Sequence, residues 1–279
     1  MTGPAATAQL IRLYGGAAAR VALRGRRKGR AADATERPVF VVGSPRSGTS
    51  FVARCLGSQP GFVDLGEVKP LKVSIKRLAM LPQDEAARRL RQTLERVRGL
   101  ALVRGLRAVE QTPETAFVLD AALRAYPQAS VVHMIRDGRD VACSLLEKGW
   151  LREARGGVDD VGNPYGGYAR SWVEPERVAD FERASEARRA GWAWRSYLTA
   201  VRAAAPSAFE VRYEELASDP AATAERLADH LGGDRISLER ALSAMHAESV
   251  GRWRRDLTPA QLGDVEAEAG PLLRQLGYA

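Results

Sequence analysis

Residues 43–50 combine glycines, hydroxyl side chains and a single arginine in a short turn. The apolar segment before it, residues 38–43, is typical of a buried parallel strand, and residues 51–56 have the spacing of a helix. A glycine-rich turn in this position directs successive backbone N–H groups into one concavity at the positive end of the helix. The sequence therefore predicts a site for a phosphate or similar oxyanion, formed by Arg46, Ser47, Gly48, Thr49 and Ser50.

This turn resembles the phosphate-binding loop of ATPases and kinases but lacks one essential residue. That loop requires a lysine directly after its last glycine, and here Thr49 follows Gly48. A P-loop nucleotide kinase or NTPase is therefore kept only as an alternative function. An ordinary strand-to-helix turn is the purely structural interpretation.

A second polar cluster follows the apolar segment 130–135. Arg136 falls at the carboxyl end of this predicted strand, where open α/β sheets bind their ligands. Ser144 comes about two helical turns later on roughly the same face, and Lys148 about one turn beyond it. The three residues suit a second phosphate, separate from the first; the alternative is a surface cluster of ion pairs.

The order of the predicted elements indicates how both clusters are positioned. Strand-like segments at 38–43, 130–135 and 209–213 alternate with helical segments at 51–56, about 84–103 and about 181–205, and residues 107–110 are a short candidate strand. This alternation predicts an α/β fold, a single P-loop-like domain with a central parallel sheet flanked by helices, over residues 38–279. Residues 149–175 show no periodicity and are predicted to form a long loop or lid. Four aromatic residues in it could line an acceptor site or serve only as packing anchors: Trp150, Tyr165, Tyr168, Trp172.

The two clusters together resemble the sulfotransferase family that uses 3′-phosphoadenosine 5′-phosphosulfate (PAPS). The resemblance rests on Ser44-Pro-Arg-Ser-Gly-Thr49 and Ile135-Arg-Asp-Gly-Arg-Asp-Val-Ala-Cys-Ser144, with shorter matches at Val211-Arg-Tyr213, Gly251-Arg-Trp253 and Leu276-Gly-Tyr278. It implies that residues 46–50 hold the 5′ end of the donor, and that Arg136, Ser144 and Lys148 hold its 3′-phosphate. It also implies a place near the nucleotide for residues of the later motifs: Tyr213, Gly251, Arg252, Trp253.

The resemblance further implies sulfuryl transfer to an acceptor hydroxyl on a glycan, glycolipid or natural product. Such a transfer needs in-line geometry and stabilised charge, which Arg46 and the backbone of its turn would supply. The resemblance places a catalytic base at Glu67, which would take the proton of the acceptor hydroxyl; a surface glutamate is the alternative interpretation. His133 alternates inside a predicted buried strand, so we interpret it as a core residue. No His, Cys or carboxylate cluster has the spacing of metal ligands, and we expect no metal ion.

One position departs from the family pattern. Related enzymes often carry a lysine before Thr-Pro or Asp-Pro, whereas this chain has Gln111 before Thr-Pro. Gln111 can donate a hydrogen bond but brings no charge, so Lys69, Lys72 or Arg252 would have to supply it. A catalytically weak protein that binds PAP, the desulfated product, is therefore a further alternative.

The positive charge of the chain is concentrated at its N-terminus. Residues 1–37 carry eight basic and two acidic residues and account for +6 of the formal net charge of +8. The remaining chain is nearly neutral, which argues against nucleic acid as a partner. We expect residues 1–37 to be a basic, partly disordered or amphipathic arm that could contact an anionic membrane surface.

Cysteine usage and hydropathy indicate the compartment. Cys55 and Cys143 do not make a disulfide framework, and no segment is apolar enough over about 20 residues to span a membrane. We therefore expect a cytoplasmic protein, peripheral to membranes at most. The family resemblance, in turn, implies a small-molecule or glycolipid acceptor as its partner. The abundance of alanine and arginine favours a bacterial source, and the oligomeric state stays open.

Overall fold

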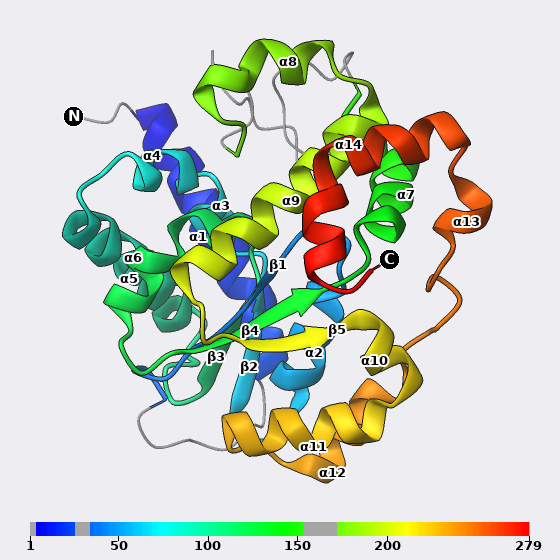
Figure 1. Ribbon diagram of the computed structural model, residues 1–279. Helices are drawn as coiled ribbons and strands as arrows, with labels where there is room; N and C mark the ends of the chain where they lie inside the picture. Colours follow the sequence, from blue (N-terminus) through cyan, green and yellow to red (C-terminus); the bar gives the residue numbers. More distant parts are fainter. Residues whose placement is uncertain (1–3, 26–33, 153–171, 279) are drawn as a thin grey trace.

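The computed structural model describes residues 4–25, 34–152 and 172–278. Its centre is a five-stranded parallel sheet with the strand order β2-β3-β1-β4-β5 (Figure 1). The strands are β1 (Val39–Gly43), β2 (Phe62–Gly66), β3 (Arg107–Glu110), β4 (Ser130–Ile135) and β5 (Phe209–Arg212). The predicted α/β fold with a central parallel sheet is confirmed, and β2 is a strand that the sequence patterns did not reveal.

Helices cover both faces of the sheet, and each face has its own hydrophobic core. Phe40 and Val42 of β1 belong to one core, whereas Val39 and Val41 belong to the other, because successive side chains of a strand point to opposite faces. On the first face pack α1 (Pro4–Gly25), α5 (Gln83–Leu100), α6 (Leu119–Ala125), α7 (Gly138–Lys148), α9 (Glu186–Ala204) and α14 (Pro259–Gln275). On the second face pack α2 (Thr49–Ser58), α10 (Tyr213–Ser218), α11 (Pro220–Leu231) and α12 (Arg235–Leu242). Shorter helices complete the described chain: α3 (Lys69–Lys72), α4 (Ile75–Ala79), η1 (Pro113–Val118), η3 (Pro175–Arg177), α8 (Val178–Arg183), α13 (Trp253–Asp256).

The strand order opens a crevice between the carboxyl ends of β1 and β4. These two strands are neighbours in the sheet, but the chain leaves β1 toward β2 on one side and leaves β4 toward β5 on the other. In open α/β sheets, ligands bind where neighbouring connections diverge in this way. The two polar clusters of the sequence, which follow β1 and β4, therefore lie at the same place in the fold.

Helix α1, within the basic segment 1–37, packs against β2, α3 and α5. Ala17, Ala18 and Val21 are buried in the core on this side of the sheet. Near the end of the helix, Arg24 Nη1 lies 2.9 Å from Asp64 Oδ2 of β2. This basic helix therefore contacts the strand that leads to Glu67.

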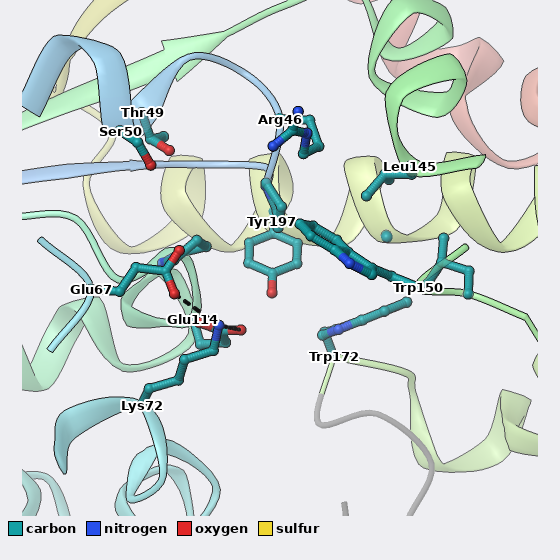
Figure 2. Close-up of a pocket in the computed structure, with 14 residues that line it drawn as sticks. Arg46, Thr49, Ser50, Glu67, Lys72, Glu114, Leu145, Trp150, Trp172 and Tyr197 are labelled. Carbon is teal, nitrogen blue, oxygen red and sulfur yellow. Dashed lines mark hydrogen bonds and ion pairs between the residues drawn. The ribbon is translucent and has the colours of Figure 1, made fainter. Parts of the chain in front are cut away.

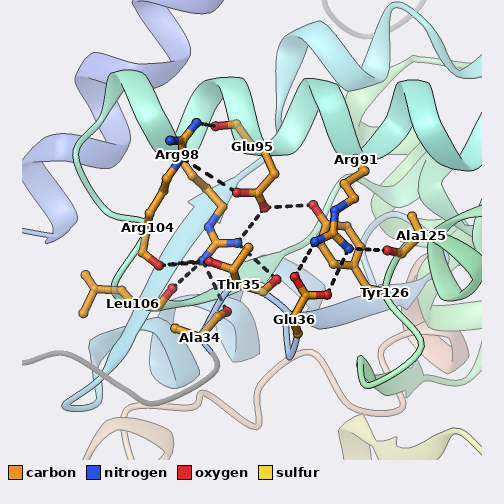
Figure 3. Close-up of polar contacts among 10 residues, drawn as sticks. All are labelled: Ala34, Thr35, Glu36, Arg91, Glu95, Arg98, Arg104, Leu106, Ala125 and Tyr126. Carbon is orange, nitrogen blue, oxygen red and sulfur yellow. Dashed lines mark hydrogen bonds and ion pairs between the residues drawn. The ribbon is translucent and has the colours of Figure 1, made fainter.

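A buried arginine fixes the chain immediately before β1 (Figure 3). Arg98 of α5 is 1% exposed and donates hydrogen bonds to the carbonyl oxygens of Ala34 (3.2 Å) and Leu106 (2.8 Å). It also lies 2.7 Å from Glu95, whose carboxylate accepts a 3.0 Å hydrogen bond from Tyr126. A buried guanidinium needs a counter-charge and several acceptors, and this cluster supplies both. The result is a fixed entry into the central strand.

Candidate active site

The turn after β1 forms an oxyanion cradle. Arg46 has a backbone φ of 71° and Gly48 a φ of 90°, left-handed conformations that turn the backbone sharply before α2. A Cβ atom at Gly48 would also meet the ring of Tyr213 at 3.1 Å. Helix α2 begins at Thr49 with no side-chain cap, so its first N–H groups can bind an anionic ligand.

Arg136 joins this cradle to the second cluster. It follows β4, and its guanidinium donates to the backbone oxygens of Arg46 (2.9 Å) and Ser249 (2.8 Å). The same guanidinium lies over the ring of Tyr213, 4.2 Å from the ring centroid. Arg46 in turn donates from Nε to the hydroxyl of Ser144 at 2.9 Å. Two motifs far apart in the sequence thus form one hydrogen-bonded group.

The C-terminal segment 249–253 closes this group from the other side. The carboxylate of Asp140, on α7, accepts hydrogen bonds from the backbone N–H groups of Gly251 (2.7 Å) and Trp253 (3.0 Å). Burial raises the pKa of Asp140, although these two hydrogen bonds act in the opposite direction. The ring of Trp253 has Arg139 at 4.0 Å, and Arg252 pairs with Glu147 of α7. Helix α7 therefore holds the segment by three separate residues.

A cleft of about 440 Å³ lies between these elements, within the range of small-molecule sites. Predicted residues that line it are Arg46, Gly48, Thr49, Ser50, Arg136, Ser144, Tyr213 and Arg252. Arg54 of α2 and Ser249 also line it and were missed by sequence reasoning, although Arg54 is one helical turn beyond Ser50. The described part of the chain therefore gives the cleft four arginines, and such a concentration of guanidinium groups suits a multiply charged anion.

Four predicted site residues occupy other positions. Ser47 is fully buried, and its hydroxyl has no hydrogen-bond partner among the described residues. Gly251 and Trp253 hold the C-terminal segment against Asp140 rather than lining the cleft themselves. Lys148 is exposed on the last turn of α7, and its neighbour Glu147 lines the cleft instead.

A second, smaller pocket adjoins the cleft (Figure 2). Arg46, Thr49 and Ser50 line both cavities, so ligands in the two would meet at these residues. One wall of the pocket is aromatic, with Trp150, Trp172 and Tyr197. Trp150 and Trp172 of the predicted loop thus line this pocket, whereas Tyr165 and Tyr168 lie outside the described residues. Tyr197 was not predicted, because its spacing in α9 is that of a core residue.

The opposite wall of the pocket is charged. Glu67 lies just beyond the end of β2, and its Oε2 is 3.0 Å from Nζ of Lys72. Lys72 is also 3.5 Å from Oε1 of Glu114 in η1. The predicted base is therefore in the smaller pocket, on the side opposite the aromatic residues (Figure 2).

The segment 110–115 connects this wall to the cradle. Gln111 is 5% exposed, and its Oε1 accepts a 3.0 Å hydrogen bond from the hydroxyl of Ser50. Glu110 is fully buried and accepts hydrogen bonds from the N–H of Thr112 (2.8 Å) and the hydroxyl of Thr115 (3.0 Å). Burial raises the pKa of Glu110 to about 7, so this carboxyl group is partly protonated near neutral pH.

Further expectations from the sequence concern His133, the two cysteines and the absence of a metal site. His133 is 1% exposed in β4, which confirms it as a core residue, and burial lowers its pKa to about 3. Cys55 and Cys143 are both buried and free. Within the described ranges, no group of three or more His, Cys, Asp or Glu residues could hold a metal ion.

Comparison with known proteins decides the family. A sequence profile described as "Sulfotransferase family" matches residues 74–236, which is more than half of the chain. The chain belongs to the sulfotransferase family. The matched range contains Arg136 and Ser144 of the second cluster. Because the chain is a member of this family, the alternative of a nucleotide kinase is not retained. No curated protein sequence matches this sulfotransferase.

Solved sulfotransferase structures share its fold. The sulfotransferase domain from the curacin biosynthetic pathway superposes with a TM-score of 0.54 at 13% identity, over 87% of this chain and 98% of that one. A sulfotransferase from Alicyclobacillus acidocaldarius gives 0.50 at 20% identity, over 86% and 94%. Mouse sulfotransferase SULT7A1, complexed with PAP, gives 0.50 at 16% identity, over 91% and 89%. At these identities the likeness establishes the fold.

Proposed function

We propose that this sulfotransferase transfers a sulfuryl group from PAPS to a hydroxyl of a small-molecule or glycolipid acceptor. One observation carries the proposal: an arginine-rich cleft and a smaller pocket meet at Arg46, Thr49 and Ser50. A donor in the cleft and an acceptor in the pocket would then be in contact at the oxyanion cradle. In-line transfer requires this arrangement of two ligands.

The residues of the cleft fit a nucleotide that carries anionic groups at both ends. The first N–H groups of α2 suit the 5′-phosphosulfate. Arg136 and Ser144 suit the 3′-phosphate, and Nε of Arg136 is buried without a hydrogen-bond partner among the described residues. Arg252 and Arg54 add positive charge at the edge of the cleft. Among the described residues that line the cleft, the acidic ones are Glu147 and Glu248, and Glu147 is paired with Arg252.

Two residues carry the proposed chemistry. PAPS supplies the sulfuryl group and leaves as PAP when the bond between sulfur and the phosphate oxygen breaks. Glu67 takes the proton of the acceptor hydroxyl as the new oxygen–sulfur bond forms. Arg46 and the backbone N–H groups of its turn stabilise the negative charge on the sulfuryl and bridging oxygens. These groups already supply positive charge, so we propose that the transfer needs no metal ion.

Replacement of Glu67 tests this assignment against the weak PAP-binding alternative, which Gln111 favours because it brings no charge to the cradle. We expect Glu67→Gln to lower PAP formation from PAPS by about 100-fold with a panel of phenol, monosaccharide and glycolipid acceptors, since general-base catalysis contributes about that much. PAP binding should be unchanged. Turnover by Glu67→Gln equal to that of the natural protein would remove the base assignment, and absence of turnover in both proteins would favour the PAP-binding alternative.

We further propose a cytoplasmic protein whose N-terminal segment contacts anionic membranes. Arg12 and Arg20 are exposed on α1, which supports such a contact. Among the described residues, no helix is long and apolar enough to cross a membrane. Sedimentation with phosphatidylglycerol vesicles tests the contact, and binding that does not weaken with salt would contradict it.

A further inference from the structure

The charged wall of the smaller pocket contains a buried ammonium group shared by two carboxylates (Figure 2). The side chain of Lys72 is 4% exposed, and its Nζ lies 3.0 Å from Glu67 and 3.5 Å from Glu114. The two carboxylates come from different elements, because Glu67 follows β2 and Glu114 belongs to η1. All three side chains line the pocket. Together they carry two negative charges and one positive charge.

Both carboxylates are fixed by one hydrogen-bonded frame. Glu110 accepts hydrogen bonds from the N–H of Thr112 and the hydroxyl of Thr115, which hold the turn that carries Glu114. The hydroxyl of Thr112 accepts a 3.0 Å hydrogen bond from the N–H of Val68, the residue after Glu67. The positions of the two carboxylates relative to Lys72 are therefore set by the same segment.

This arrangement solves a charge problem that a base in this position would otherwise have. A buried ammonium is costly without a counter-charge. If Lys72 were paired with Glu67 alone, proton uptake by Glu67 would leave the ammonium unpaired, and this cost would oppose proton transfer. Glu114 keeps a negative charge beside Lys72 whether or not Glu67 is protonated.

We propose that Lys72 and Glu114 are positioning residues that tune Glu67 as the base, with Lys72 orienting its carboxylate and Glu114 balancing Lys72 when Glu67 is protonated. The inference rests on the proposed function, in which the proton of the acceptor hydroxyl moves to Glu67, the acceptor oxygen bonds to sulfur, and PAP departs. Lys72 keeps its proton throughout, so charge in the wall changes only at Glu67.

Other charged groups surround this trio and must stay constant in a test. Arg46 lines the pocket from the turn after β1, and Glu110, the last residue of β3, is close enough to Glu67 for the two charges to interact. Asp64 of β2 is paired with Arg24 of α1. Variants at Lys72 and Glu114 leave all of these in place.

The proposal predicts opposite effects for two variants. In protein labelled with ¹³C at the glutamate carboxyl carbon, the Glu67 signal is identified by its loss in Glu67→Gln. In Lys72→Met, Glu67 stands beside Glu114 without the cation, and its titration midpoint should rise by about 1 to 3 pH units. In Glu114→Gln, Glu67 is the carboxylate of the pair that still faces Lys72, and the titration midpoint of Glu67 should fall. The acid limb of the pH–rate profile should move in the same two directions.

Arg77→Met, which removes an exposed cation of the neighbouring α4, is the matched control and should leave the midpoint unchanged. Midpoints that stay constant, or that move in the same direction in both variants, would overturn the proposal. The titration needs no acceptor, so it is separate from the proposed function. Full turnover by Glu67→Gln would contradict the assignment of Glu67 as the base. Absence of PAP binding by the natural protein would contradict the assignment of PAPS as the donor.

Discussion

At the scale of single residues, the site depends on buried polar groups with defined partners. Arg136 contacts two backbone oxygens and an aromatic face, and Glu110 accepts two hydrogen bonds in a fully buried position. Such groups are costly to bury, and these contacts offset much of the cost, although Nε of Arg136 has no hydrogen-bond partner among the described residues. Glu110 is unusual because burial outweighs those bonds and raises its pKa to about 7.

This raised pKa predicts a pH-dependent cost in stability. Folded Glu110 keeps its proton up to about pH 7, whereas the unfolded chain releases it near pH 4.5, the ordinary pKa of a glutamate. The folded state therefore binds more protons in this window, and its stability falls as the pH rises from about 4.5 to 7, by about 3 kcal/mol from this group. We expect Glu110→Gln to gain stability relative to the natural protein over the same window, measured by urea unfolding at several pH values. Glu176→Gln, an exposed control, should show no such trend. If the stability of Glu110→Gln changed with pH in parallel with that of the natural protein, the raised pKa of Glu110 would be contradicted.

At the scale of elements, α7 connects the second cluster to the C-terminal segment. Ser144 contacts Arg46, Asp140 binds the N–H groups of Gly251 and Trp253, and Glu147 pairs with Arg252, all from this one helix. A helix places residues three to four positions apart on one face, so these side chains share a direction. Helix α7 thus determines where the segment 249–253 lies over the cleft.

Asp140→Asn tests this role of α7. The asparagine amide has one oxygen. Its NH₂ group would therefore face one of the two backbone N–H groups that now donate hydrogen bonds to Asp140. We expect PAP to bind about tenfold more weakly, because loss of a hydrogen bond to a charged group costs about 1.5 to 3 kcal/mol. Isothermal titration calorimetry measures the change. Asp229→Asn on the exposed face of α11 is the control, and equal affinity in the two variants would show that Asp140 does not position the segment.

At the scale of the whole molecule, the sequence predicted the sheet and the cradle because both depend on local patterns. Apolar runs that end in glycine or arginine mark β1 and β4, and parallel pairing brings their carboxyl ends together. Arg46, Arg136 and Ser144 could therefore be placed in one site before the structure was known. Tyr213 and Arg252 entered through the family resemblance, and both line the same cleft.

Other features depend on contacts between distant segments and have no local signal. The strand β2 carries Asp64 in its centre, which breaks the apolar pattern, and Arg24 compensates that charge from α1. The contact of Lys72 with Glu114 joins two short helices whose sequences indicate no shared site. Arg98 lies in an amphipathic helix, where an arginine is ordinarily solvent-exposed, and it is buried because backbone oxygens of two other segments, at Ala34 and at residues 104–106, accept its hydrogen bonds.

The measurement that tests the central claim most directly is a thermal-shift titration with PAP, AMP and ATP·Mg²⁺. At about 100 times its dissociation constant, PAP should raise the melting temperature by about 5 °C, since saturation of this order adds about 2.7 kcal/mol of stability. AMP should give a smaller shift, and Arg136→Ala should reduce the shift with PAP to that of AMP. Stabilisation by ATP·Mg²⁺, with PAP no better than AMP, would contradict the account.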